Sequence, residues 1–235
     1  MKKILLIVFL LMTTVAGFAQ RTIALSPFTA IDVFGPFEVE LIKSDKASIE
    51  IDYRGIDEED IVAEVQHDVL KLKIKNRHYM KDWSSNSYRK SDYARVKVYY
   101  TDIDVLEAQA GALITSLRPV KSKLLMIDCS MGAEITLDIF AKKVEVVSNM
   151  GGVLELTGQT EQLEVKANMG GVFKGSRLES KIVYVKASMG ADVMVNVSEE
   201  LDASAGLGAT IDYVGGPNVR HTSKSMGGEV NRRSN

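Results

Sequence analysis

The chain has 235 residues, of which 46% are hydrophobic and 26% are charged, and its formal net charge is -2. This length allows one or two domains with a sizeable core, and the composition argues against an intrinsically disordered chain. The near balance of charge gives no reason to expect nucleic acid or an anionic membrane surface as a partner.

The first residues have the pattern of a signal peptide. Lys2 and Lys3 precede an apolar run at residues 4–11, and Gly17 and Ala19 form the small-x-small pattern that a signal peptidase requires. We therefore predict that residues 1–19 are removed and that the protein is exported to the periplasm, the cell surface or the medium. An uncleaved N-terminal anchor is the alternative, although the run is short for a membrane span. No later stretch is apolar enough to span a bilayer.

A short motif, usually Met-Gly followed by Ala or Gly, returns along the C-terminal half of the chain. Its glycines follow one another at intervals of 21, 19, 19, 20, 18 and 19 residues, within the range of known solenoid repeats. The repeat glycines are Gly111, Gly132, Gly151, Gly170, Gly190, Gly208 and Gly227.

The positions around each glycine alternate between apolar or small residues and polar residues. Three positions before it the residues are small, as at Cys129 and Ser148, and three positions after it they are apolar, as at Ile135 and Leu154. Period-two alternation predicts strands with one buried face, not helices. We predict an all-β, parallel β-helix with coils of about 19 residues, with a flat antiparallel meander as the alternative. Polar connectors are expected at residues 157–162, 175–180 and 196–200.

Two side chains of the repeat are assigned to the core. The methionine before each glycine recurs once per coil within an apolar register, so we predict that it fills the core and binds no metal. The only cysteine, Cys129, is predicted to be a small buried residue and not a reactive thiol. Residues 101–235 are expected to form the regular solenoid, and its polar end to form a C-terminal cap.

Residues 20–100 are predicted to be an irregular β part. Residues 31–41 read as one more strand-glycine-strand coil, and strands are expected at 47–53, 69–74 and 94–100. Residues 76–93 are polar and aperiodic and are predicted to form an exposed loop. Exposed aromatic side chains next to arginine suit stacking on a sugar or packing against a protein, although the loop could instead cover the solenoid wall. The candidate ligand contacts are Tyr79, Trp83, Tyr88, Arg89 and Tyr93.

No catalytic constellation is found in the sequence. The outward columns two and four positions after the glycines never place two carboxylates side by side. Glu145 and Glu164 stack on neighbouring coils, but Lys166 and Lys186 lie near them, as on a solvated wall of mixed charge. None of the three histidines has a partner at metal-ligand spacing. We predict no catalytic residue, no metal and no cofactor.

The segments "FTAIDVFGPFEVELIKSDKASIEIDY", "LKLKIKN", "VKVYYTDIDVLEAQAGALI" and the "NMGG" coils together resemble the putative auto-transporter adhesin, head GIN domain family, which is common in Bacteroidetes. The resemblance extends from about Phe28 to Val230, and the "SG" usual at the turn is mostly "MG" here. It implies a right-handed parallel β-helix and supplies no catalytic motif.

The function expected from these patterns is that of an exported, non-enzymatic envelope or secreted protein that recognises a glycan or a cell-surface protein. A polysaccharide-active β-helix enzyme and a purely structural or assembly protein of the envelope are the alternatives.

Overall fold

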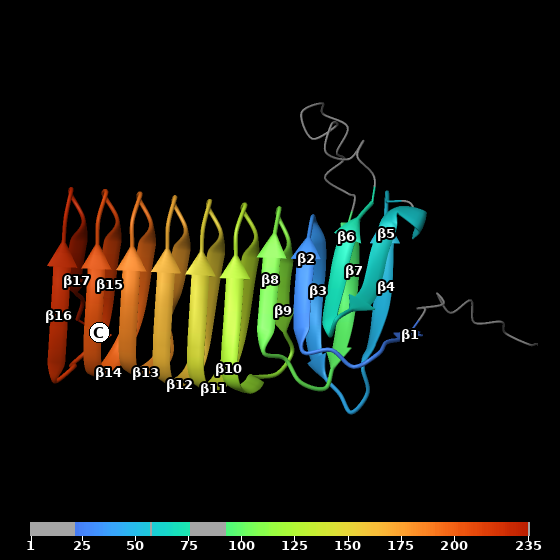
Figure 1. Ribbon diagram of the computed structural model, residues 1–235, viewed down its shortest axis with the longest axis horizontal. Helices are drawn as coiled ribbons and strands as arrows, with labels where there is room; N and C mark the ends of the chain where they lie inside the picture. The colour runs from blue at the N-terminus through green and yellow to red at the C-terminus, as the bar shows by residue number, and fades with distance from the viewer. Residues whose placement is uncertain (1–21, 57, 76–92, 235) are drawn as a thin grey trace, which may run out of the picture.

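The computed structural model describes residues 22–56, 58–75 and 93–234. They form a β-solenoid in which strands stack in two walls along one long axis (Figure 1). No α-helix occurs among these residues, and none of their elements is a helix long and apolar enough to cross a membrane. The predicted all-β solenoid is confirmed.

The C-terminal coils stack in parallel and in register. Their strands are β10 (Val120–Cys129), β11 (Glu134–Ser148), β12 (Val153–Ala167), β13 (Val172–Ala187) and β14 (Asp192–Ala205). Leu125 pairs with Val144, and Ile135 pairs with Leu154, so equivalent positions of successive repeats lie side by side. The parallel pairing excludes the antiparallel meander, and the alternating burial within each strand matches the period-two pattern.

Tight turns connect the two walls at one edge of the solenoid, the upper edge in Figure 1. At the first regular turn, Met131 and Gly132 have φ of 52° and 71°, and the Ala133 N–H donates to the carbonyl oxygen of Ser130 at 3.1 Å. Positive φ at both central positions is the pattern of a type I′ turn. The seven repeat glycines all have φ between 69° and 80°, a range that glycine adopts without steric cost.

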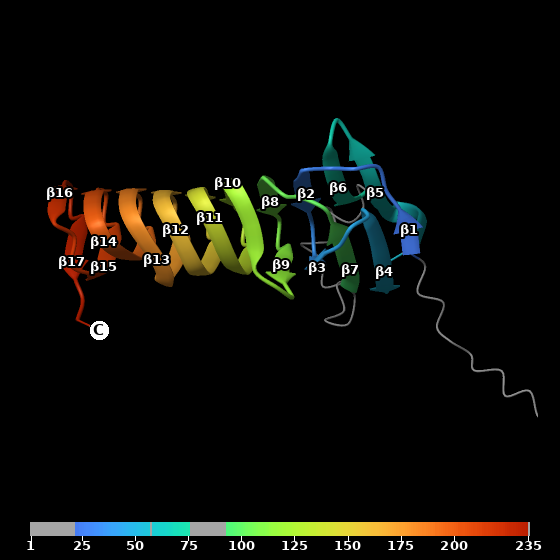
Figure 2. The same ribbon diagram turned by 90° about the horizontal axis from the view of Figure 1, so that it is seen from below.

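The opposite edge is made by continuous strands, and the predicted polar connectors are wrong in this respect. β11 to β14 each run from the second wall of one coil, around the edge, into the first wall of the next, as Figure 2 shows. Shifts of register between Glu155 and Thr157 and between Gly175 and Glu179 mark bulges at these bends. Bulges bend a strand without ending it, so a coil of 18 or 20 residues fits the stack.

The N-terminal coils do not follow chain order. β2 (Ala30–Phe34) and β3 (Phe37–Lys43) form the predicted strand-glycine-strand coil. It lies between the coil of β6 (Val69–Ile74) and β7 (Tyr93–Tyr100) and the coil of β8 (Val105–Gln109) and β9 (Leu113–Ser116). The first coil in sequence is therefore the second in space, which explains why no simple repeat is visible there.

Antiparallel strands close the N-terminal end. β4 (Ser48–Arg54) pairs with β7, and β5 (Ile61–Gln66), which follows the short 3-10 helix η1 (Glu58–Asp60), pairs with β6. β1 (Thr22–Ala24) adds to the outer side of β4. A reversal of strand direction ends the parallel stack at this end.

The C-terminal end consists of β15 (Thr210–Gly215), β16 (Val219–Lys224) and β17 (Glu229–Arg232). Every residue of β16 is exposed, including Thr222 and Lys224 at inward positions of the repeat. Polar residues on such an open edge discourage pairing with another strand.

The core lies between the two walls, where Phe28, Phe37 and Phe173 are fully buried and Cys129 has no exposed surface. The predicted burial of Cys129 is confirmed. The assignment of the turn methionines to the core is wrong, because the turn directs them outward and Met150 and Met169 are each 49% exposed. Their odd position in the alternation indicated burial, but the two turn residues interrupt that alternation.

Candidate functional site

Four of the five predicted ligand contacts, Tyr79, Trp83, Tyr88 and Arg89, lie outside the described residues. Tyr93, expected in the loop, is the first residue of β7, where its backbone pairs with that of Arg54. A binding role for these residues stays a prediction.

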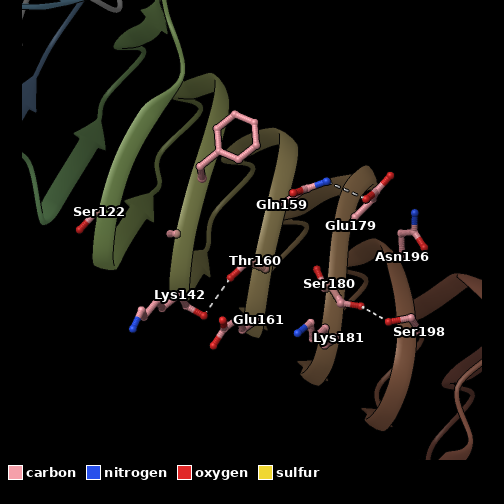
Figure 3. Close-up of a pocket in the computed structure, with 12 residues that line it drawn as sticks. Ser122, Lys142, Gln159, Thr160, Glu161, Glu179, Ser180, Lys181, Asn196 and Ser198 are labelled. Carbon is pink, nitrogen blue, oxygen red and sulfur yellow. Dashed lines mark hydrogen bonds between the residues drawn. The ribbon is translucent and has the colours of Figure 1, made fainter.

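The structure presents another candidate, an open groove of about 750 Å³ along the bend edge of the solenoid (Figure 3). We call it the bend-edge groove. It crosses the bent parts of β11, β12, β13 and β14, so each coil contributes the same few positions to it. The lining residues are Ser122, Phe140, Ala141, Lys142, Gln159, Thr160, Glu161, Glu179, Ser180, Lys181, Asn196 and Ser198.

The base of the groove is a column of small residues. Ser122, Ala141, Thr160 and Ser180 pair in register on successive coils. The hydroxyl of Thr160 lies within hydrogen-bond distance of two carbonyl oxygens, that of Gln162 at 3.0 Å and that of Lys142 at 3.3 Å. Thr160 and Ser180 are buried, and the Ser180 hydroxyl donates to the carbonyl oxygen of Leu178 at 3.2 Å. Such short side chains leave the groove open above them.

One wall of the groove is a column of larger side chains, in which Phe140, Gln159, Glu179 and Asn196 pair in register. Phe140 is 42% exposed, an unusual position for a phenylalanine ring. The Gln159 amide Nε2 donates to Glu179 Oε2 at 3.0 Å, which fixes two planar polar groups side by side (Figure 3).

The other wall alternates in charge, with Lys142, Glu161 and Lys181 on three successive coils. Figure 3 shows these side chains at the outer rim of the bends. Opposite charges in alternation leave the groove close to neutral, so it has no strong preference for a polyanion or a polycation.

A surface of mixed character continues the groove beyond Phe140. A second hollow of about 840 Å³ shares Ser122 and Phe140 with the first and is lined also by Leu124 and Met126, which are each 38% exposed. Its lining also includes charged residues, Asp102, Asp104, Lys121 and Lys123. The ring of Phe140 therefore lies between a polar groove and a hollow that mixes charged and half-exposed apolar side chains.

Outside the groove, the wall formed by the strands that precede the tight turns carries an acidic column, which the glycine alignment did not reveal. Asp32, Glu107 and Asp128 pair in register on three adjacent coils. Burial raises the pKa of Glu107, and the charges of Asp32 and Asp128 raise it further. The column is hidden in the sequence because Asp32 belongs to a coil that is displaced in chain order.

The other stacked acids behave as expected for a solvated wall. Glu145 pairs with Glu164, and the ammonium of Lys143 lies 2.6 Å from Glu145 and 4.0 Å from Glu164. A hydrogen bond from Lys166 lowers the pKa of Glu164. Across the described part of the chain, no group of three His, Cys, Asp or Glu side chains is placed to hold a metal ion.

The groove residues could not be found from the glycine alignment. The bends fall where the coils differ in length, so Gln159, Glu179 and Asn196 share no fixed distance from their glycines. The one local sign of a binding site in the sequence was a phenylalanine at an outward position, Phe140, between Ile139 and Ala141. Alternation alone does not show whether such an exposed aromatic residue has a function.

Comparison with known proteins gives one family match and a set of similar crystal structures. No curated protein matches the chain in sequence. The crystal structure of a putative adhesin from Bacteroides fragilis is similar, with a TM-score of 0.75 at 18% identity over 91% of this chain and 95% of that one. A putative lipid binding protein from Parabacteroides distasonis and a putative adhesin from Parabacteroides merdae each have a TM-score of 0.67 at 16% identity over the same shares. At these identities the likeness shows a shared fold.

The family match itself covers residues 27–217, which include every coil from β2 to β15 and all of the bend-edge groove. The chain therefore belongs to the family described as putative auto-transporter adhesin, head GIN domain.

Proposed function

We propose that this protein is an exported adhesin-like module that binds a glycan in the bend-edge groove. The observation that carries the proposal is the half-exposed ring of Phe140 at the head of a column of hydrogen-bonding side chains, Gln159, Glu179 and Asn196. The family description as an adhesin head supports recognition in general, and the signal pattern of residues 1–19 supports export.

The chemistry of the groove suits a sugar. A pyranose presents an apolar face and a belt of hydroxyl groups, so it packs on an aromatic ring while its hydroxyls bond to amides and carboxylates. Gln159 and Glu179 already bond to each other, so these two side chains lose less conformational entropy when a ligand binds over them. The groove crosses successive coils and repeats with them, which suits an extended chain of sugar units.

A polysaccharide-active enzyme is the second candidate, because two carboxylates, Glu161 and Glu179, line the same groove. Glycoside cleavage commonly uses two such groups across the scissile bond. Release of reducing ends from a bound polysaccharide, lost in Glu161→Gln, would establish the enzyme instead of the adhesin. Binding without product supports the adhesin.

The test is a glycan array probed with the purified protein and three variants. We expect selective binding by the wild type and a loss of at least tenfold in affinity for Phe140→Ala. Phe34→Ala is the matched control, because Phe34 is 37% exposed on β2, away from the groove, and its loss should leave binding unchanged. Trp83→Ala tests the aromatic segment at residues 76–93.

The outcomes separate the candidates. Binding lost only in Trp83→Ala would move the site to that segment, and equal losses in both phenylalanine variants would point to general damage. If no glycan binds, the glycan proposal is wrong, and a protein ligand or a structural role takes its place.

A further inference from the structure

The turn edge, opposite the bend-edge groove, carries a column of thioether side chains. The first central residue of six consecutive turns is methionine in all but one, and every one of these side chains is at least 38% exposed. The exposed fractions are 38% for Met131, 49% for Met150, 49% for Met169, 48% for Met189, 49% for Leu207 and 78% for Met226.

Neither the backbone conformation of the turn nor the burial of the side chain explains why the first central turn residue is methionine. Met150 and Met169 have φ of 46° and 48°, a left-handed conformation that asparagine, aspartate and glycine adopt more readily than other residues. A half-exposed apolar side chain obtains only part of the free energy of full burial. A residue that the backbone conformation disfavours and burial favours only in part, yet recurs on four consecutive coils, indicates that the thioether group itself is used.

Backbone hydrogen bonds hold these turns in register. The N–H of Gly132 donates to the carbonyl oxygen of Met150 at 3.2 Å, that of Gly151 to Met169 at 3.2 Å, and that of Gly170 to Met189 at 3.0 Å. Stacked strands lie about 4.8 Å apart, so each methionine starts one such step from the next. Three rotatable bonds per side chain allow the sulfurs of two adjacent coils to converge on one small ion.

We propose that Met131, Met150, Met169 and Met189 form a binding ladder for a soft monovalent cation of the Cu(I) class. Thioether sulfur is a soft, neutral ligand that selects Cu(I) over hard divalent cations. The preceding turn residues Ser130, Asn149, Asn168 and Ser188 are also neutral, so these turns offer no carboxylate for calcium or magnesium. Leu207 ends the ladder and separates Met226 from it.

The test uses Ag⁺ as a probe of the same class that does not change oxidation state in air. Titration calorimetry is performed in a Cys129→Ser background, which removes the only thiol. Serine fits there, because Ser148 occupies the equivalent position of the next coil and bonds to its own turn. We expect Ag⁺ to bind, and Met150→Leu with Met169→Leu to weaken binding at least tenfold.

Leucine is the matched replacement, because Leu207 occupies the same turn position with the same 49% exposure as Met150 and φ of 50°. The variant keeps the fold and the apolar ridge and removes only sulfur. Met226→Leu, outside the ladder, should bind Ag⁺ as the parent does. A thermal melt of each variant checks that the fold is intact.

A second readout locates the ion. With ¹³C-labelled methionine methyl groups, Ag⁺ should shift the signals of the ladder methionines and leave Met194, on β14, and Met226 in place. Absence of Ag⁺ binding, unchanged affinity in the double leucine variant, or equal losses in Met226→Leu would each overturn the proposal. Retained Ag⁺ binding in the leucine variant would show that the ion is held elsewhere.

Discussion

The side-chain hydroxyl of Ser148 donates a hydrogen bond to the carbonyl oxygen of Gly152, 2.8 Å away on the far side of the Asn149–Gly152 turn. One coil earlier, the thiol of Cys129 makes the same contact with the carbonyl oxygen of Ala133 at 3.2 Å. The small inward residues three positions before each glycine therefore do more than leave room, because two of them bond across the turn to its last residue.

Replacing Ser148 by alanine should lower the free energy of unfolding by about 1 kcal/mol, the usual net value of one such hydrogen bond. Alanine fits the site, because Ala167 occupies the same position in the next coil and is also buried. Urea titration of Ser148→Ala measures the change. The control is Ser223→Ala on the exposed strand β16, which should have no effect. Equal stability of Ser148→Ala and wild type would show that the contact contributes nothing.

Cys129 should be unreactive in the folded protein. Burial raises the pKa of its thiol to about 12, so almost no thiolate is present at pH 8. Ellman's reagent should modify Cys129 only as the protein unfolds, and the rate should rise through the urea transition. Rapid stoichiometric modification of the native protein at pH 8 would contradict the burial described for this side chain.

Two glycine-to-alanine changes should lower the free energy of unfolding by very different amounts. Gly158, at a bend, has φ of 106°, and a Cβ there would lie 2.1 Å from the carbonyl oxygen of Ile139. Gly132, at a turn, has φ of 71° and open space around its Cβ position. We expect Gly132→Ala to cost about 1 kcal/mol of backbone strain and Gly158→Ala more than about 3 kcal/mol, because backbone must also move. Thermal unfolding of both variants decides this, and similar costs would contradict the close approach at the bend.

Stability should depend on pH through Glu107. Its pKa is raised in the fold above the ordinary 4.5, so the folded state binds the proton more tightly than the unfolded state. Ionisation of Glu107 therefore destabilises the fold, and its contribution to stability falls as pH rises from 4.5 through the raised value. Glu107→Gln should be more stable than wild type at pH 7, by less than about 1 kcal/mol because solvent screens this partly exposed group.

The same comparison at pH 3.5 provides the control for Glu107→Gln, because the carboxyl is then protonated in both states and the difference should vanish. Melting temperatures of the two proteins at both pH values suffice. A glutamine variant that is less stable at pH 7, or equally different at both pH values, would show that the acidic column does not act as described.

The regular half of the fold could be predicted from sequence because a solenoid places like residues on like. The glycine intervals and the inward columns at Cys129 and Ile135 defined the coils and their register, and the structure pairs these positions as expected. The N-terminal half could not be ordered in this way. The coil of β2 and β3 comes first in the chain, but it lies between the coil of β6 and β7 and the coil of β8 and β9.

The candidate site was beyond the same reasoning for two physical reasons. Alternation assigns a side chain to the core face or the solvent face of a solenoid wall. The turn at Met131 and the bend at Phe140 lie at the edges between the walls, where this assignment no longer holds. Alternation therefore predicts the methionines in the core, and it predicts polar connectors over only part of the groove, at residues 157–162, 175–180 and 196–200. Both surfaces arise from stacking many coils, and no single repeat shows them.

The most direct test of the account is hydrogen–deuterium exchange of the protein alone and with the array glycan that binds most tightly. We predict slower exchange in peptides that cover residues 139–142, 158–161 and 178–181, and unchanged exchange at the turns, including residues 130–133 and 149–152. Protection confined to residues 76–93 or to the turn edge, with none at the bends, would contradict the assignment of recognition to the bend-edge groove.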